Sequence, residues 1–164
     1  IGAALRLPVR FLVVADLFGE SRLLDWFVLG SGAIPLPRHR APLSALRAAL
    51  SALGRGDVVG VFPEGTRVTH WGTLPPKRGA AWLAARTGVP LLPVAVIGTG
   101  RVFGLDTRLR RGRIRVVIGG PLEGEDPAGL TDRWAEWLTE TISDHPGSEV
   151  DGPRRAFYDP GMNG

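Results

Sequence analysis

The residues best suited to chemistry lie in one segment, Phe62-Pro63-Glu64-Gly65-Thr66-Arg67. An apolar run at residues 57–61 comes directly before it and predicts a buried strand, which Pro63 ends because proline cannot donate a ladder hydrogen bond. Gly65 permits a sharp turn and the close approach of a ligand. We therefore expect Glu64 and Arg67 beyond the carboxyl end of a strand, where open α/β sheets bind ligands. A guanidinium in that place suits a phosphate group, since it can bind two oxygens at once.

A plainer interpretation of this segment is a surface turn with a Glu64–Arg67 ion pair, worth roughly 0–1 kcal/mol. The position of the whole segment directly after a buried strand favours the ligand site instead. In that site the backbone N–H groups of Gly65 and Thr66 are further phosphate donors.

Length and composition limit the classes of protein. The chain has 164 residues, 44% of them hydrophobic, which predicts a single domain with a real core. It has no cysteine, which excludes disulfides, thiolate catalysis and cysteine-based zinc sites. The net charge of +4 favours anionic partners such as phospholipid headgroups. No apolar stretch reaches the roughly 18–20 residues that span a bilayer.

Hydrophobic periodicity predicts an alternation of strands and helices. The fold class is therefore α/β, with a mostly parallel or mixed sheet flanked by helices. Residues 98–112 are expected to form an irregular loop, residues 1–144 one domain, and residues 145–164 a disordered tail. The expected strands are 10–15, 33–36, 57–62, 91–97 and 113–118; the expected helices are 23–29, 43–53, 77–86 and one that begins at Asp126-Pro127 or at Thr131.

Three further motifs accompany the segment at 62–67. Gly32 is followed six positions later by Arg38, Lys77-Arg78-Gly79 begins a predicted helix, and residues 89–95 read Val-Pro-Leu-Leu-Pro-Val-Ala. In this order, over residues 1–125, the motifs resemble those of the lysophosphatidic acid acyltransferase family, the 1-acyl-sn-glycerol-3-phosphate acyltransferases. The resemblance implies transfer of a fatty acyl group from acyl-CoA or acyl carrier protein to the free hydroxyl of lysophosphatidate, giving phosphatidate.

The resemblance also implies a binding site for the substrate phosphate. It implies no metal and no cofactor beyond the acyl-CoA or acyl-carrier-protein co-substrate, and it implies a membrane surface on the cytoplasmic side as partner. Lys77 is the only lysine of the sequence and is expected at a helix N-terminus, which attracts anions. The residues implied for the phosphate site are Arg38, Glu64, Gly65, Thr66, Arg67 and Lys77.

The family's catalytic motif, histidine followed five positions later by aspartate, is absent from this sequence. His39 is followed by Ser44 at that spacing, His70 by Pro75, and His145 by Val150. Residues 1–5 predict the middle of a helix, so we expect the motif upstream of Ile1 and no catalytic residue, and no activity, in this chain alone. The strand at 11–15 also lacks a lysine that the family often has there, although Asp16 matches a usual acidic position.

Two other hypotheses remain open. One is a non-catalytic domain of the same family that binds phospholipid or acyl-CoA. The other is a basic α/β domain that binds nucleic acid through the arginines of residues 108–115, which lack interleaved aromatic residues for stacking on bases. Trp71 is expected to be exposed and to contact a membrane or an acyl chain, whereas Trp134 and Trp137 are expected in the core.

Overall fold

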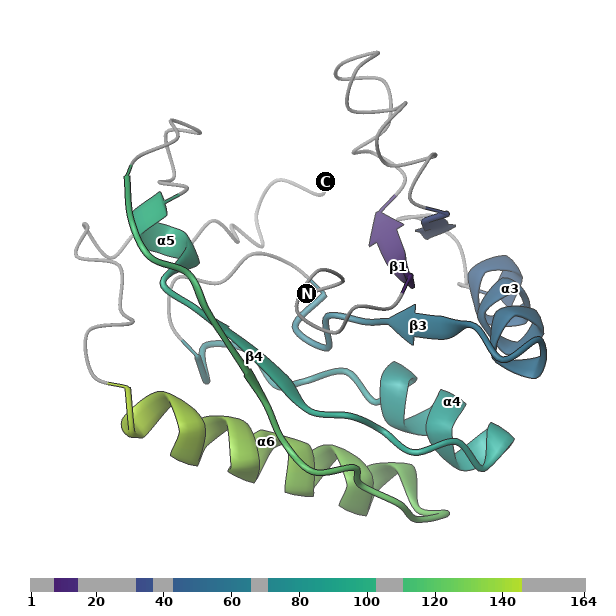
Figure 1. Cartoon of the computed structure of the whole chain (residues 1–164). Helices are drawn as coiled ribbons and strands as arrows, with labels where there is room; N and C mark the ends of the chain where they lie inside the picture. Colours follow the sequence, from purple (N-terminus) through teal and green to yellow (C-terminus); the bar gives the residue numbers. More distant parts are fainter. Residues whose placement is uncertain (1–7, 15–31, 37–42, 66–70, 103–110, 146–164) are drawn as a thin grey trace, which may run out of the picture.

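The computed structural model describes residues 8–14, 32–36, 43–65, 71–102 and 111–145 (Figure 1). The helices predicted at residues 1–5 and 23–29 and the tail from 146 to 164 lie outside these ranges. The elements in chain order are β1 (Val9–Val14), β2 (Ile34–Leu36), α3 (Leu43–Gly54), β3 (Val58–Gly60), α4 (Gly79–Thr87), β4 (Val94–Ile97), α5 (Thr99–Val102), β5 (Arg115–Ile118) and α6 (Pro127–Ser143).

The first sheet is parallel, in the order β2-β1-β3. Leu12 of β1 lies opposite Ile34 of β2, and Phe11 lies opposite Gly60 of β3. All three strands therefore end at the same edge of the sheet. The chain crosses from one side of β1 to the other between β2 and β3, which makes the β1/β3 boundary the switch point where such sheets bind ligands.

The second sheet is an antiparallel pair, β4 and β5, in which Val94 lies opposite Ile118. Figure 1 shows the pair as a twisted ribbon running along α6. The strand predicted from residue 91 begins only at Val94, because Pro93 interrupts the ladder after an isolated bridge between Leu91 and Leu122. The parallel sheet and its helices confirm the predicted α/β class, and the described antiparallel strands form a separate pair.

The buried face of α3 consists of alanines rather than leucines. Ala45, Ala49 and Ala52 are at most 1% exposed, whereas Leu43 is 57% exposed. The leucine spacing predicted the helix correctly, and Leu46, Leu50 and Leu53 are only partly buried at the edge of the same cluster. Small side chains bring the helix close to the sheet.

Helix α6 covers α4 and the β4–β5 pair. Its Leu130 packs against Ala81 and Ala84 of α4, and its Trp134 and Leu138 pack against Ala95 of β4. Helix α4 ends at Thr87, one residue beyond the predicted end at 86, and Gly88, with a left-handed backbone (φ 69°), caps it.

Two details of the prediction were wrong. Helix α4 begins at Gly79, so Lys77 lies before the helix and does not open it. The supposed irregular segment 98–112 contains the short helix α5, which carries no apolar periodicity long enough to detect.

Helix α6 begins at the first of the two predicted positions, with Asp126 as its cap. The carboxylate accepts hydrogen bonds from the backbone N–H of Ala128 (3.0 Å) and Gly129 (2.9 Å). Both bonds lower the pKa of Asp126, and the bond from Gly129 has the larger effect.

The cap makes the stability of the protein pH-dependent in a defined direction. Folding lowers the pKa of Asp126. The stability that its ionised carboxylate contributes is therefore fully present above the unfolded pKa of about 3.9, and it is lost as the pH falls through the folded pKa. We expect Asp126→Ala to lower Tm at neutral pH, with a difference from wild type that shrinks below about pH 4. Thermal unfolding of both proteins from neutral pH to below about pH 4 measures this difference in Tm. A difference that stays constant with pH would show that the Asp126 carboxylate does not stabilise the helix as a cap.

Within the part of the chain that the structure describes, no helix is both long and apolar enough to cross a membrane.

Candidate functional site

The segment at 62–65 emerges at the β1/β3 boundary, where two phenylalanines meet. The rings of Phe11 and Phe62 are stacked with centroids 5.7 Å apart and planes at 18°. A Cβ on Gly60 would lie 2.5 Å from the Phe11 ring, so the ring occupies space that only a glycine leaves free. Phe62 is thereby held over β1 at the predicted edge, while remaining 54% exposed.

A tight turn follows Phe62. The N–H of Gly65 donates to the carbonyl oxygen of Phe62 (3.1 Å), and Gly65 has a left-handed backbone (φ 68°). Lys77 returns to this turn, because its N–H donates to the carbonyl oxygen of Pro63 at 2.8 Å. The side chain of Lys77 lies directly on Gly65, where an added Cβ would be 2.7 Å from Nζ. The turn and the only lysine of the chain therefore form one unit.

The predicted phosphate-site residues divide into two groups. Glu64, Gly65 and Lys77 are described, and the structure brings Gly65 and Lys77 into contact. Glu64 is half-buried in the same turn and forms no hydrogen bond or ion pair with another described residue. Arg38, Thr66 and Arg67 lie outside the described residues. Arg38 follows the end of β2 at Leu36 by two residues, and β2 ends at the same sheet edge as β3.

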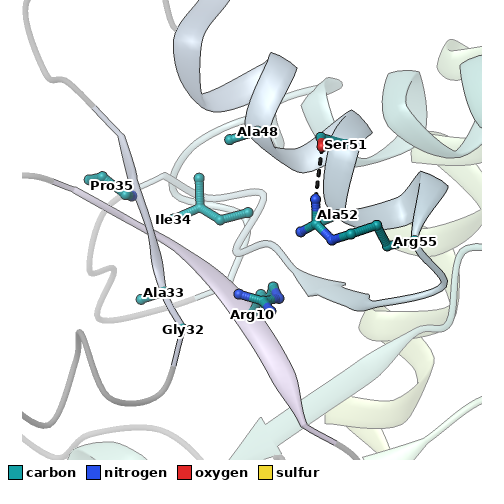
Figure 2. A pocket seen from close by; sticks show the side chains of 9 residues that line it. All are labelled: Arg10, Gly32, Ala33, Ile34, Pro35, Ala48, Ser51, Ala52 and Arg55. Carbon is teal, nitrogen blue, oxygen red and sulfur yellow. Dashed lines mark hydrogen bonds between the residues drawn. The ribbon is translucent and has the colours of Figure 1, made fainter.

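A separate hollow lies at the opposite, amino-terminal edge of the sheet (Figure 2). Its volume is about 360 Å³. None of the predicted phosphate-site residues lines it. Two arginines, one serine and several small apolar residues form its wall: Arg10, Gly32, Ala33, Ile34, Pro35, Ala48, Ser51, Ala52 and Arg55.

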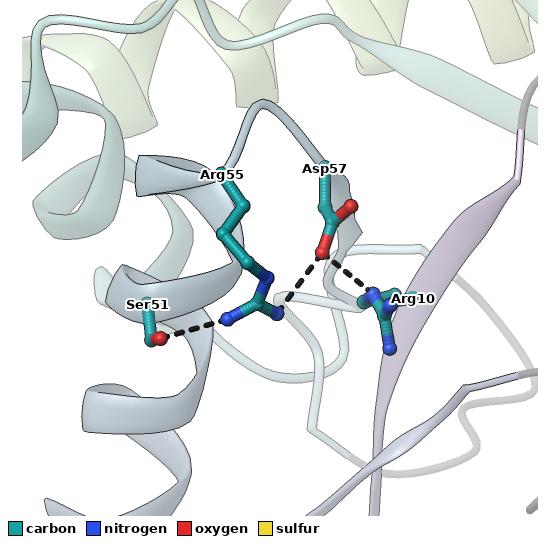
Figure 3. Close-up of polar contacts among 4 residues, drawn as sticks. All are labelled: Arg10, Ser51, Arg55 and Asp57. Carbon is teal, nitrogen blue, oxygen red and sulfur yellow. Dashed lines mark hydrogen bonds and ion pairs between the residues drawn. The ribbon is translucent and has the colours of Figure 1, made fainter.

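The arginines of this hollow share one carboxylate (Figure 3). Asp57 Oδ2 lies 2.8 Å from Arg10 Nε and 3.1 Å from Arg55 Nη2, and Arg55 Nη1 donates to Ser51 Oγ at 2.8 Å. The cluster links the start of β1, the entry to β3 and the end of α3. The first motif glycine, Gly32, borders this cluster: it has a left-handed backbone (φ 70°), and a Cβ there would lie 2.9 Å from Arg10 Nη1.

The described part of the chain contains a single histidine, His145, at the end of α6. His145 follows the last residue of α6 by two positions, and its Nδ1 lies 2.7 Å from the carbonyl oxygen of Thr141 in that helix. Its ring is thus engaged within α6. His39 and His70 lie outside the described residues.

A protein-family model described as "Acyltransferase" matches residues 1–97, which include β1, β2, β3 and the turn with Lys77. This chain belongs to the acyltransferase family. The predicted resemblance is confirmed.

Among similar proteins, the chloroplastic 1-acyl-sn-glycerol-3-phosphate acyltransferase of Brassica napus is 32% identical over 125 residues, which cover 74% of this family member and 36% of the relative. The 1-acyl-sn-glycerol-3-phosphate acyltransferase of Bacillus subtilis is 29% identical, with 76% of this chain and 60% of the relative covered. The chain thus spans less than two thirds of each of these relatives.

A solved structure has the same architecture. The 1-acyl-sn-glycerophosphate (LPA) acyltransferase PlsC from Thermotoga maritima superposes with a TM-score of 0.64 at 25% sequence identity. The match covers 84% of this acyltransferase chain and 56% of the other. It therefore extends beyond residue 97, where the family model ends.

Two features of the site escaped the sequence analysis. The stack of Phe11 on Phe62 had one available signal, a glycine at position 60 inside a strand, which often marks a close approach. The placement of Trp71 was wrong: it is half-buried and packs against the cluster of Ala95, Trp134 and Leu138, because a distant helix supplies its partners.

Proposed function

We propose that the protein containing this chain transfers a fatty acyl group from an acyl-CoA or acyl-carrier-protein thioester to the free hydroxyl of lysophosphatidate. The hydroxyl oxygen attacks the thioester carbonyl, a C–O ester bond forms and the C–S bond breaks. The hydroxyl proton passes to a general base, the histidine–aspartate pair that the family resemblance implies, and then to the departing thiolate. The products are phosphatidate and the free thiol.

The observation that carries this proposal is the unit of Gly65 and Lys77 at the switch point of the sheet. It presents a lysine ammonium at the turn that leads into Thr66 and Arg67. The carboxyl ends of β2 and β3 lie at one edge, so Arg38 and Arg67 both follow strands that end there. Cationic side chains around one edge suit the phosphate of a lysophospholipid. A membrane surface as partner and a location on its cytoplasmic face belong to the same proposal, because the acceptor is a membrane lipid.

The names of the relatives support the same substrate. The matched Brassica napus, Bacillus subtilis and Thermotoga maritima proteins all carry names for acylation of 1-acyl-glycerol-phosphate. A non-catalytic binding domain of the family is the alternative, and it predicts that the full-length protein binds lysophosphatidate without turnover. Family membership favours a lipid phosphate over nucleic acid as the anion.

The first test is an acyl-transfer assay of the full-length protein with lysophosphatidate and both kinds of thioester. We expect Arg67→Ala to lower kcat/KM by roughly 10- to 100-fold, because hydrogen bonds to a charged group are lost. Arg67→Lys should also be impaired, since an ammonium lacks the two-pronged geometry of guanidinium.

A matched control tests whether the phosphate binds at the carboxyl-terminal edge of the sheet or at the amino-terminal hollow. Arg55→Ala removes an exposed arginine from the amino-terminal hollow and should leave kcat/KM near the wild-type value. Wild-type turnover in Arg67→Ala, or a comparable loss in Arg55→Ala, would place the phosphate elsewhere and refute the assignment.

A further inference from the structure

The ladder between β1 and β3 stops short of the motif turn. Its last pair joins Phe11 to Gly60, and β3 ends at Gly60. Phe62 lies two residues beyond this pair, so main-chain pairing with β1 does not reach it. The intervening residue, Val61, packs against the cluster beneath α3 on one face of the sheet. On the other face, Phe62 is held by a side chain of β1.

Phe11 supplies that side chain. In a sheet, a residue also neighbours the position two beyond its direct partner, at about 7–8 Å, a distance that an aromatic ring can span. Gly60 has no side chain, so the Phe11 ring extends across it, where a Cβ would lie 2.5 Å from the ring. The ring then stacks on Phe62, with centroids 5.7 Å apart and planes at 18°. The stack continues the attachment of β3 to β1 beyond the last ladder pair.

The motif turn is built on Phe62. Its carbonyl oxygen accepts the Gly65 N–H at 3.1 Å, and the carbonyl oxygen of Pro63 accepts the Lys77 N–H at 2.8 Å. The Lys77 side chain lies along Gly65, where a Cβ would be 2.7 Å from Nζ and 3.1 Å from Cδ. Gly65 and Lys77 are both exposed, so a ligand can reach them from solvent. A continuous series of contacts therefore links the Phe11 ring to the Lys77 ammonium.

We propose that Phe11 is a positioning residue for the Lys77 ammonium. It acts through Phe62 and the turn rather than through contact with the substrate. By holding the start of the turn, the ring limits the freedom that Lys77 loses when it binds a phosphate, which lowers the cost of binding. Phe11 belongs to none of the four motifs. This inference rests on the proposed function, since it concerns the phosphate of the same lysophosphatidate.

Four variants separate the stack from general stability. Phe11→Leu removes the ring and keeps an apolar side chain, whereas Phe11→Tyr keeps the ring. Leu50→Ala is the control for a loss of stability, because Leu50 is partly buried in the cluster beneath α3 and is not part of the stack. Lys77→Ala, alone and combined with Phe11→Leu, tests whether the effect of Phe11 passes through the ammonium.

The first measurement is the kinetics of the full-length protein with lysophosphatidate. We expect Phe11→Leu to raise KM about tenfold, near the lower end of what losing a hydrogen bond to a charged group costs, with a smaller change in kcat. Phe11→Tyr and Leu50→Ala should keep a KM near that of the wild type. In the Lys77→Ala background, Phe11→Leu should raise KM little further, because the group that it positions is gone.

Hydrogen exchange of the same full-length proteins gives a readout that needs no substrate. The N–H groups of Gly65 and Lys77 both donate to carbonyl oxygens of the turn, so their exchange rates report how often the turn opens. We expect both amides to exchange faster in Phe11→Leu, relative to the amides of the β1–β3 ladder. In Phe11→Tyr and Leu50→Ala this relative rate should match the wild type.

The outcomes distinguish this role from the proposed function. A wild-type KM in Phe11→Leu, or an equal rise in Phe11→Tyr or Leu50→Ala, would overturn the positioning role and leave the proposed function intact. The same rise in the Lys77→Ala background would overturn it too, since Phe11 would then not act through Lys77. A wild-type protein that fails to acylate lysophosphatidate would refute the proposed function. Unchanged exchange at both turn amides in Phe11→Leu would by itself show that the stack does not hold the turn.

Discussion

Gly65→Ala is expected to remove most acyl-transfer activity, with kcat/KM falling on the order of 100-fold, the scale that a displacement of about 1 Å produces at a reacting site. The new Cβ would lie 2.7 Å from Nζ and 2.9 Å from Cε of Lys77, so the end of the lysine side chain must shift away from Gly65. The left-handed backbone of residue 65 adds a conformational cost of about 1–2 kcal/mol.

The same loop contains a control for the conformational cost alone. Gly72 also has a left-handed backbone (φ 85°), but a Cβ there would meet nothing within 4 Å. Gly72→Ala should therefore lose similar stability and keep far more activity than Gly65→Ala. Combining Gly65→Ala with Lys77→Ala should cost less than the sum of the two single changes, because the clash is gone. Equal losses in Gly65→Ala and Gly72→Ala would show that the contact with Lys77 does not matter.

Trp134→Ala is expected to cause the largest loss of stability, about 3–5 kcal/mol in the free energy of unfolding. Trp134 is 6% exposed and packs with Ala95 and Leu138 where α6 meets β4, and it forms the edge-on contact with Trp71. Small neighbours such as Ala95 cannot extend to fill the cavity, so the loss should be near the upper end of that range.

Urea unfolding at equilibrium measures this prediction, and an unchanged m-value would show that both proteins unfold in the same way. Trp82→Ala is the control, because Trp82 is 39% exposed on α4. Its effect should be clearly smaller. A loss in Trp134→Ala no greater than that in Trp82→Ala would mean that α6 contributes little to the core.

Local pattern predicted most of the elements that the structure describes. The apolar runs before Pro63 and around Leu12 are parallel strands, and the leucine spacing at 43–53 is a helix. The face of that helix was less predictable, since alanine is a helix former with weak hydrophobicity and its burial depends on how closely the sheet approaches. The antiparallel direction of β5 likewise depends on tertiary pairing with β4.

The site was predictable as a set of residues and not as an arrangement. The motif at 62–67 and the glycine at 65 follow from the sequence, and their place at a sheet edge follows from the strand before them. The return of Lys77 to Gly65 depends on how a loop closes, and the partner of Trp71 lies 68 positions away. Contacts of this kind leave no periodic signal.

The stack at the switch point has a consequence for variation in this family member. The Phe11 ring fills the volume that a side chain at position 60 would otherwise occupy. The residues at positions 11 and 60, on adjacent strands, therefore compete for the same space. The pair, rather than either residue, is then the unit in which substitution is tolerated: a bulkier residue at 60 requires a slimmer one at 11. The aromatic support beneath Phe62 would be lost in that exchange, which links a packing choice inside the sheet to the orientation of the motif above it.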